Sequence, residues 1–248
     1  MSGHSKWATI KRKKGANDAQ RGKIFTKLGR ELAVAVKTGG SPDPATNSRL
    51  KDVIAKCKSN NMPNDTIMRS IKKAAGEGSG TNYEENIYEG YGPNGVAVIV
   101  ETLTDNKNRT AADMRHYFDK FGGNLGTSGC VMFMFDRKGI ILIENEGDLD
   151  EEQVMMDALE AGAEDIVNNE GTFEVYTDPA DFSAVNDALS AKGYSFLSAE
   201  QTKIPANYVD VEGEDNLKFM NKLLEALDDN DDVTNVWHNW NEPDEDEE

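Results

Sequence analysis

The spacing of apolar residues changes once along this chain, at a short glycine- and serine-rich segment, residues 76–82. Before this segment, apolar residues recur every three or four positions, which is the period of an amphipathic helix. After it, short apolar runs typical of strands alternate with helical stretches. A flexible segment between two such patterns is typical of a domain boundary. The chain is therefore expected to divide into a helical part and an α+β part.

Three amphipathic helices are predicted before the boundary. The first follows Asn17–Asp18 and runs to Lys37. The second begins at Asp43–Pro44, where a capping residue precedes a proline at the first helical position. The third starts around Pro63–Asp65 and stops at Gly76. Short connections between three such helices predict a small helical domain over residues 1–80.

Four strand–helix–strand units follow the boundary. Two such units make one split-βαβ, ferredoxin-like sheet, so four units predict two ferredoxin-like domains. Periodicity alone does not show which units pair. The tail at 241–248 holds six acidic residues and is predicted to be disordered. Strands are expected at 96–102, 131–135, 140–144, 164–168, 173–177, 194–197, 208–211 and 233–237, and helices at 108–121, 150–160, 180–191 and 215–228.

Charge is divided at the same boundary. Residues 1–80 carry 17 Lys and Arg against 6 Asp and Glu, a net +11, whereas residues 81–248 carry 10 against 39, a net −29. Basic clusters attract polyphosphates, largely through counterion release. The basic part therefore predicts an anionic polymer as partner, and a solvated basic face without ligand is the alternative. For the acidic part we expect either contact with protein or shielding of its own basic domain.

The basic residues form two groups that suit phosphate binding. Residues 11–14 are a run of four cations, while Lys23, Lys27 and Arg30 are four and three residues apart, on one face of the first helix. Trp7 can stack on a base or anchor this arm against the helices. Further cations, Arg69, Lys72 and Lys73 among them, extend the positive field. The candidate nucleic-acid-binding residues are Lys6, Trp7, Lys11, Arg12, Lys13, Lys14, Arg21, Lys23, Lys27 and Arg30.

No catalytic, cofactor or metal motif is recognised. Residues 90–95 fit G-x-G-x-x-G, but Pro93 interrupts the loop and a strand follows instead of a helix, so a tight turn is predicted. The three histidines lie far apart, and Cys57 and Cys130 are expected to be unpaired thiols. The acids at 228–232 are placed at a helix end. We therefore expect no enzyme activity, no cofactor or metal, no small-molecule substrate and, without an apolar run of about 18 residues, no membrane partner.

Six short motifs stand out along the chain: Gly3–Trp7, Arg21–Phe25, Asn60–Pro63, Tyr88–Pro93, Asp105–Thr110 and Gly122–Gly126. Together they resemble the YebC/PmpR family, and the resemblance extends from residue 3 to about residue 239. It implies a helical N-terminal domain and two α+β domains, the third inserted within the second. The second would then comprise residues 81–136 and 205–240, and the inserted one residues 137–204.

The resemblance also implies a function. It points to a cytoplasmic transcriptional regulator that binds DNA, with the basic N-terminal residues as the nucleic-acid surface. Mitochondrial relatives are translational activators, and some bacterial relatives are linked to ribosomes. A translation factor that binds ribosomal RNA, with ribosomal proteins near its acidic lobes, is therefore the alternative.

Overall fold

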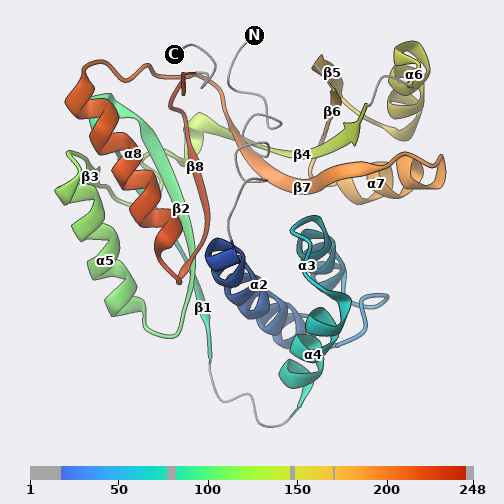
Figure 1. The fold of residues 1–248 in the computed structure, drawn as a ribbon, viewed down its shortest axis with the longest axis horizontal. Coiled ribbons are helices and arrows are strands. Elements are labelled where there is room, and N and C mark those ends of the chain that lie inside the picture. The colour runs from blue at the N-terminus through green and yellow to red at the C-terminus, as the bar shows by residue number, and fades with distance from the viewer. Residues whose placement is uncertain (1–17, 77–81, 146–148, 170, 244–248) are drawn as a thin grey trace.

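The structure is a computed structural model that describes residues 18–76, 82–145, 149–169 and 171–243 (Figure 1). Lys6, Trp7 and the cationic run at 11–14 lie outside the described residues. So do most of the predicted linker at 76–82 and most of the acidic tail at 241–248.

The N-terminal part consists of three helices, α2 (Asp18–Gly39), α3 (Ser48–Ser59) and α4 (Asn64–Ala75). Their amphipathic faces meet in one core, as their periodicity predicts. The core is closed by buried residues that come from all three helices, Leu28, Leu32, Leu50, Cys57, Ile67 and Ile71 among them.

The predicted start of the second helix is wrong by several residues. Residues 44–46 form a turn, closed by a hydrogen bond from the Ala45 amide to the Asp43 carboxylate. The cap is Asn47, whose side-chain oxygen accepts from the Leu50 amide at 3.0 Å. Its Nδ2 also donates to the carbonyl of Ala35 at 2.8 Å, so Asn47 joins the end of α2 to the start of α3.

The first sheet has the strand order β3-β1-β2-β8. β1 pairs with β2 along its whole length, and β8 pairs with the other edge of β2. Helices α5 and α8 pack on one face of this sheet around Met114, Phe118, Met220 and Leu223, and Figure 1 shows them on the side turned away from α2. The elements are β1 (Glu84–Tyr91), β2 (Ala97–Thr104), α5 (Lys107–Lys120), β3 (Asn124–Leu125), α8 (Glu214–Asp229) and β8 (Val233–His238).

The second sheet has the strand order β5-β6-β4-β7. Its first and third strands, β4 and β6, are neighbours at the centre, which is the split-βαβ arrangement. All its strands lie between β3 and β8 in the sequence, so the predicted α+β architecture, with one sheet inserted in the other, is confirmed. The elements are β4 (Phe135–Glu144), α6 (Glu151–Ala161), β5 (Asp165–Asn169), β6 (Thr172–Thr177), α7 (Phe182–Ala191) and β7 (Phe196–Pro205).

Two predicted strands are wrong, and two observed strands are not among the predicted ones. Residues 132–134 form a 3-10 turn, because the amides of Val131 and Met132 donate to the Glu89 carboxylate at 2.9 and 2.8 Å instead of to a neighbouring strand. The segment at 208–211 makes only an isolated bridge, between Val209 and Trp240. The two strands that the sequence does not predict are β1 and the two-residue β3. Residues 93–95 form a short turn that leads into β2, as the interrupted glycine motif predicts.

Candidate nucleic-acid interface

The cationic face of α2 lies against the turn that joins α8 to β8. This turn, residues 228–232, is called the acidic turn below, because four of its five residues are aspartates. Lys23 Nζ forms an ion pair with Asp229 Oδ1 at 2.8 Å, and Lys27 Nζ donates to the carbonyl of Asp228 at 2.5 Å. The sequence places these residues more than 200 positions apart, yet the fold brings them into contact.

Arg30 makes the most buried contact of this face. Its Nη1 donates to the carbonyl of Asp231 at 2.8 Å and to Asp232 Oδ1 at 3.0 Å. Its guanidinium also lies 5.7 Å from the centre of the Tyr83 ring. Arg21 is exposed on the first turns of the same helix. The three cations whose spacing predicts a common face are thus brought together, and all three bind oxygen atoms of this chain.

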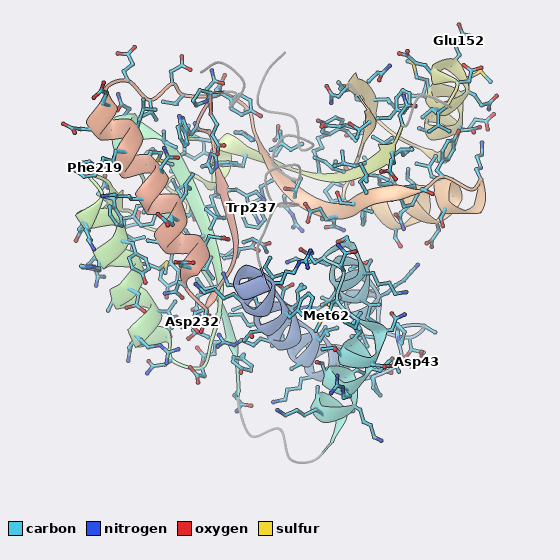
Figure 2. The ribbon with its side chains drawn as sticks, in the orientation of Figure 1. Asp43, Met62, Glu152, Phe219, Asp232 and Trp237 are labelled. Carbon is cyan, nitrogen blue, oxygen red and sulfur yellow. The ribbon has the colours of Figure 1, made fainter. Side chains whose placement is uncertain are left out.

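Asp232 fixes the acidic turn to the first sheet domain (Figure 2). Its Oδ2 accepts from Thr104 Oγ1 at 3.0 Å, from Thr110 Oγ1 at 2.8 Å and from Arg109 Nη2 at 2.8 Å. Burial opposes ionisation of this carboxyl, but the hydrogen bonds from Arg109, Thr110 and Thr104 outweigh it and lower its pKa. The charge on Asp232 is therefore retained inside the domain.

The motif at residues 105–110 supplies two of the side chains that bind Asp232. Asn106 caps α5 by accepting from the Arg109 amide at 3.1 Å, which sets the helix start beside the turn. Arg109 and Thr110 then reach Asp232 from the first turn of α5. The sequence alone does not show that this motif binds Asp232, because 122 positions separate Asp232 from Thr110.

A second polar network joins the helical domain to both sheets. Lys56 of α3 donates to the side-chain oxygen of Asn235 on β8 at 3.3 Å. Asn235 in turn donates to Glu101 of β2 at 3.1 Å, and Glu101 pairs with Lys203 of β7 at 2.5 Å. The Lys203 ammonium lies 3.6 Å from the centre of the Trp237 ring, which Figure 2 labels. Charges from all three parts of the chain therefore meet at one junction.

The cations of α4 are arranged differently from those of α2. Arg69, Lys72 and Lys73 stand three and four residues apart and are all exposed, so they form one outward face. In the part of the chain that the structure describes, none of the three has an ion pair with a carboxylate. Arg69 and Lys72 also border a surface hollow together with Met68, whose side chain is 62% exposed. We call these three cations the α4 basic face.

The described ranges, 18–76, 82–145, 149–169 and 171–243, offer few groups for other chemistry. Within those ranges, no group of three His, Cys, Asp or Glu side chains is arranged to hold a metal ion. Cys57 and Cys130 are free thiols, and burial raises the pKa of Cys57 to about 12, which disfavours a reactive thiolate. None of the helices in the described ranges is long and apolar enough to cross a bilayer.

Comparison with known proteins gives matches over almost the whole chain. The family model of the TACO1/YebC protein N-terminal domain matches residues 5–77, and that of the TACO1/YebC second and third domain matches residues 83–240. A protein of Ruminiclostridium cellulolyticum named "Probable transcriptional regulatory protein" is 63% identical over 248 residues and covers 100% of both chains. One of the same name from Acetivibrio thermocellus is 61% identical, over 97% of this chain and 99% of its own.

A solved structure has a similar fold. The crystal structure of a conserved hypothetical protein from Aquifex aeolicus superposes with a TM-score of 0.80 at 44% identity, covering 93% of this chain and 94% of its own. The two family models together account for the helical domain and for both sheets. The chain belongs to the TACO1/YebC family.

Proposed function

We propose that this protein regulates gene expression by binding DNA through its basic N-terminal domain. The observation that carries the proposal is the α4 basic face, three exposed cations on one side of a helix, none of which forms an ion pair with a carboxylate of the described residues. Such a face attracts phosphates. The names of the relatives support a role in regulation.

The sequence adds more cations to the same domain. Lys6, Trp7 and residues 11–14 lie outside the described part, and we propose that they extend the nucleic-acid surface. The protein would act in the cytoplasm, by binding and without catalysis. The limits predicted above for the domains, 1–80, 81–136 with 205–240, and 137–204, remain a proposal.

Ribosomal RNA is the second candidate for the bound polymer, and an observation on helix α6 of the inserted domain favours it. Met155, Met156 and Leu159 of α6 are exposed, with 41, 56 and 56% of their surface accessible, among the acidic residues Glu151 and Glu152. An apolar strip with an acidic border suits a basic protein, and ribosomes offer basic proteins beside RNA. A DNA duplex gives this strip no partner.

Charge reversal on α4 tests the proposed function. We expect Arg69→Glu/Lys72→Glu/Lys73→Glu to weaken binding to a short DNA duplex. Each neutralised phosphate contributes about −0.9 to the slope of log K against log salt concentration, so losing three contacts makes the slope shallower by about 2–3. Arg115→Glu/Lys218→Glu/Lys222→Glu is the matched control, because it changes the same residue types by the same charge on exposed positions of α5 and α8.

The control is expected to keep the wild-type slope. Equal slopes for the wild type and the α4 variant would refute the proposed surface. Co-sedimentation with ribosomes that survives DNase but not RNase would favour the RNA alternative over DNA.

A further inference from the structure

We propose that the acidic turn is an intramolecular latch: it occupies the cationic face of α2 and must leave before a nucleic-acid backbone can bind there. This inference rests on the proposed function, because it concerns access to the same basic domain. Nucleic-acid binding at α2 and contact between α2 and the acidic turn would then exclude one another.

The cationic face of α2 is already occupied by the acidic turn. Lys23, Lys27 and Arg30 each direct a donor group to an oxygen of the acidic turn, at 2.8, 2.5 and 2.8 Å. The acceptors are a mixture of carboxylate and carbonyl oxygens, the kind of acceptor that a phosphate backbone also offers. A phosphate placed against the same donors would overlap the turn, so only one of the two can be bound.

Polar contacts hold the helical domain against the sheet domains. The buried core of the helical domain draws only on residues 28–74, and the cores of the sheets draw on none of these. The ion pair Lys23–Asp229 is exposed, with 46 and 62% of the two side chains accessible. Lys51 pairs with Asp187 of α7 at 3.0 Å in a similarly exposed setting. Exposed pairs contribute little and are screened by salt, so a polyanion can displace them. The Arg30–Asp232 pair is more buried, with 22 and 6% of the two side chains accessible, and a phosphate oxygen can replace the carboxylate oxygen at Arg30.

The acidic turn keeps its own contacts with the first sheet domain when α2 leaves. Asp232 is buried, and its Oδ2 accepts from Thr104, Thr110 and Arg109, all within that domain, while only its Oδ1 accepts from Arg30 of α2. Asp229, in contrast, points outward to Lys23, and the charges of Asp228 and Asp231 add to the field at Lys23. The turn thus presents a preformed negative surface to α2, while the α4 basic face stays open for a first contact with the polymer.

The first experiment measures affinity for a short DNA duplex at low salt. Asp228→Asn/Asp229→Asn/Asp231→Asn removes the negative charge of the latch from exposed positions and leaves the buried Asp232 in place. We expect this variant to bind about threefold to tenfold more tightly than the wild type, since the Lys23–Asp229 ion pair and the negative charges of Asp228 and Asp231 no longer compete with phosphates. Glu212→Gln/Glu214→Gln/Asp215→Asn is the matched control, with the same change in charge at the other end of α8. It is expected to change the affinity less than twofold.

The second experiment observes the latch itself. A carbodiimide joins an amine and a carboxylate that are in contact, so it should link Lys23 to Asp229 in the free protein. Peptide mass spectrometry gives the yield. We expect saturating DNA duplex to lower this yield at least threefold. The link between Lys192 and Glu160, which are 2.9 Å apart within the inserted sheet domain, serves as the internal control and should not change.

The outcomes separate the latch from the proposed function. Equal tightening by both triple variants would show that only net charge matters and would overturn the latch. A Lys23–Asp229 link whose yield DNA does not alter would overturn it too, even if the protein binds DNA. Binding by the latch variant in the absence of binding by the wild type would support it strongly. Absence of binding by all three proteins would instead refute the proposed function, and the latch with it.

Discussion

Replacing Asp232 with alanine should destabilise the first sheet domain by about 2–4 kcal/mol. The side chains of Thr104 and Thr110 are fully buried and both donate to Asp232 Oδ2. A buried donor that loses its acceptor costs on the order of 1–3 kcal/mol, and this applies to Thr104 and to the part-buried Arg30, whereas Thr110 can still donate to the Asn106 carbonyl at 3.1 Å. Arg109 adds little, because half of its side chain is exposed and water can replace the lost carboxylate.

Chemical denaturation followed by tryptophan fluorescence measures this change. Trp237 and Trp240 both lie at or near β8, so their emission reports the unfolding of this domain. Asp231→Ala is the matched control, since Asp231 is exposed and only its backbone carbonyl accepts from Arg30. A free energy of unfolding for Asp232→Ala within about 0.5 kcal/mol of the control would refute the reasoning, because surface changes alone reach that size.

The difference in free energy of unfolding between the wild type and Asp232→Ala should depend on pH with a definite sign. The pKa of Asp232 is lowered in the folded state, because hydrogen bonds to Arg109, Thr110 and Thr104 outweigh the effect of burial. A carboxyl of this kind stabilises the protein fully above its unfolded pKa, about 3.9, and loses that contribution as the pH falls through the folded pKa. The difference in free energy of unfolding between wild type and Asp232→Ala should therefore be constant from pH 7 to about pH 5 and shrink below about pH 4. A difference that grows toward low pH would contradict the assignment.

Three further outcomes are expected. Changing residues 11–14 together to Glu should abolish binding to a DNA duplex in a titration while leaving the thermal unfolding midpoint unchanged; unaltered affinity would remove the electrostatic argument. Glu89→Gln should lower the free energy of unfolding by about 1.5–3 kcal/mol, because the carboxylate accepts from the amides of Gly129, Val131 and Met132 and an amide cannot replace all three contacts. Gly123→Ala should cost about 1–3 kcal/mol in the same denaturation assay, since a Cβ there would lie 2.3 Å from the Tyr91 carbonyl oxygen; Gly22→Ala, with open space around it, should be neutral or stabilising.

The helices were predictable because each buries one side of an amphipathic pattern. The last helix, for example, was expected at 215–228 and is observed at Glu214–Asp229. Its apolar residues Met220, Leu223 and Leu227 are all fully buried at spacings of three and four. Local sequence carries this signal, so little tertiary information is needed.

The first sheet was less predictable because its pairings depend on side chains from other segments. β1 contains Glu84, Glu85 and Glu89 and lacks an apolar run, so it gave no strand signal. The apolar run at 131–135 gave one, but Glu89 takes the amides that a strand would need. One buried carboxylate thus explains both the predicted strand that is absent and the loop that replaces it.

Part of the candidate site could be predicted from the spacing of residues on α2. Lys23, Lys27 and Arg30 were expected on a common face and do share one. What lies against that face is set by the tertiary fold, which brings up the acidic turn from 206 positions away in the case of Asp229. The opposite charges of the two parts of the chain are compatible with such shielding, but they do not predict which residues make the contact.

The most direct test of the account is to find which residues touch nucleic acid. The full-length protein can be photocrosslinked to a DNA duplex, and separately to a ribosomal RNA fragment, and the linked peptides identified by mass spectrometry. The account predicts links confined to residues 1–75, with Lys23, Lys27 and the α4 basic face among them. Links that fall only within residues 82–240, or none with either polymer, would contradict it.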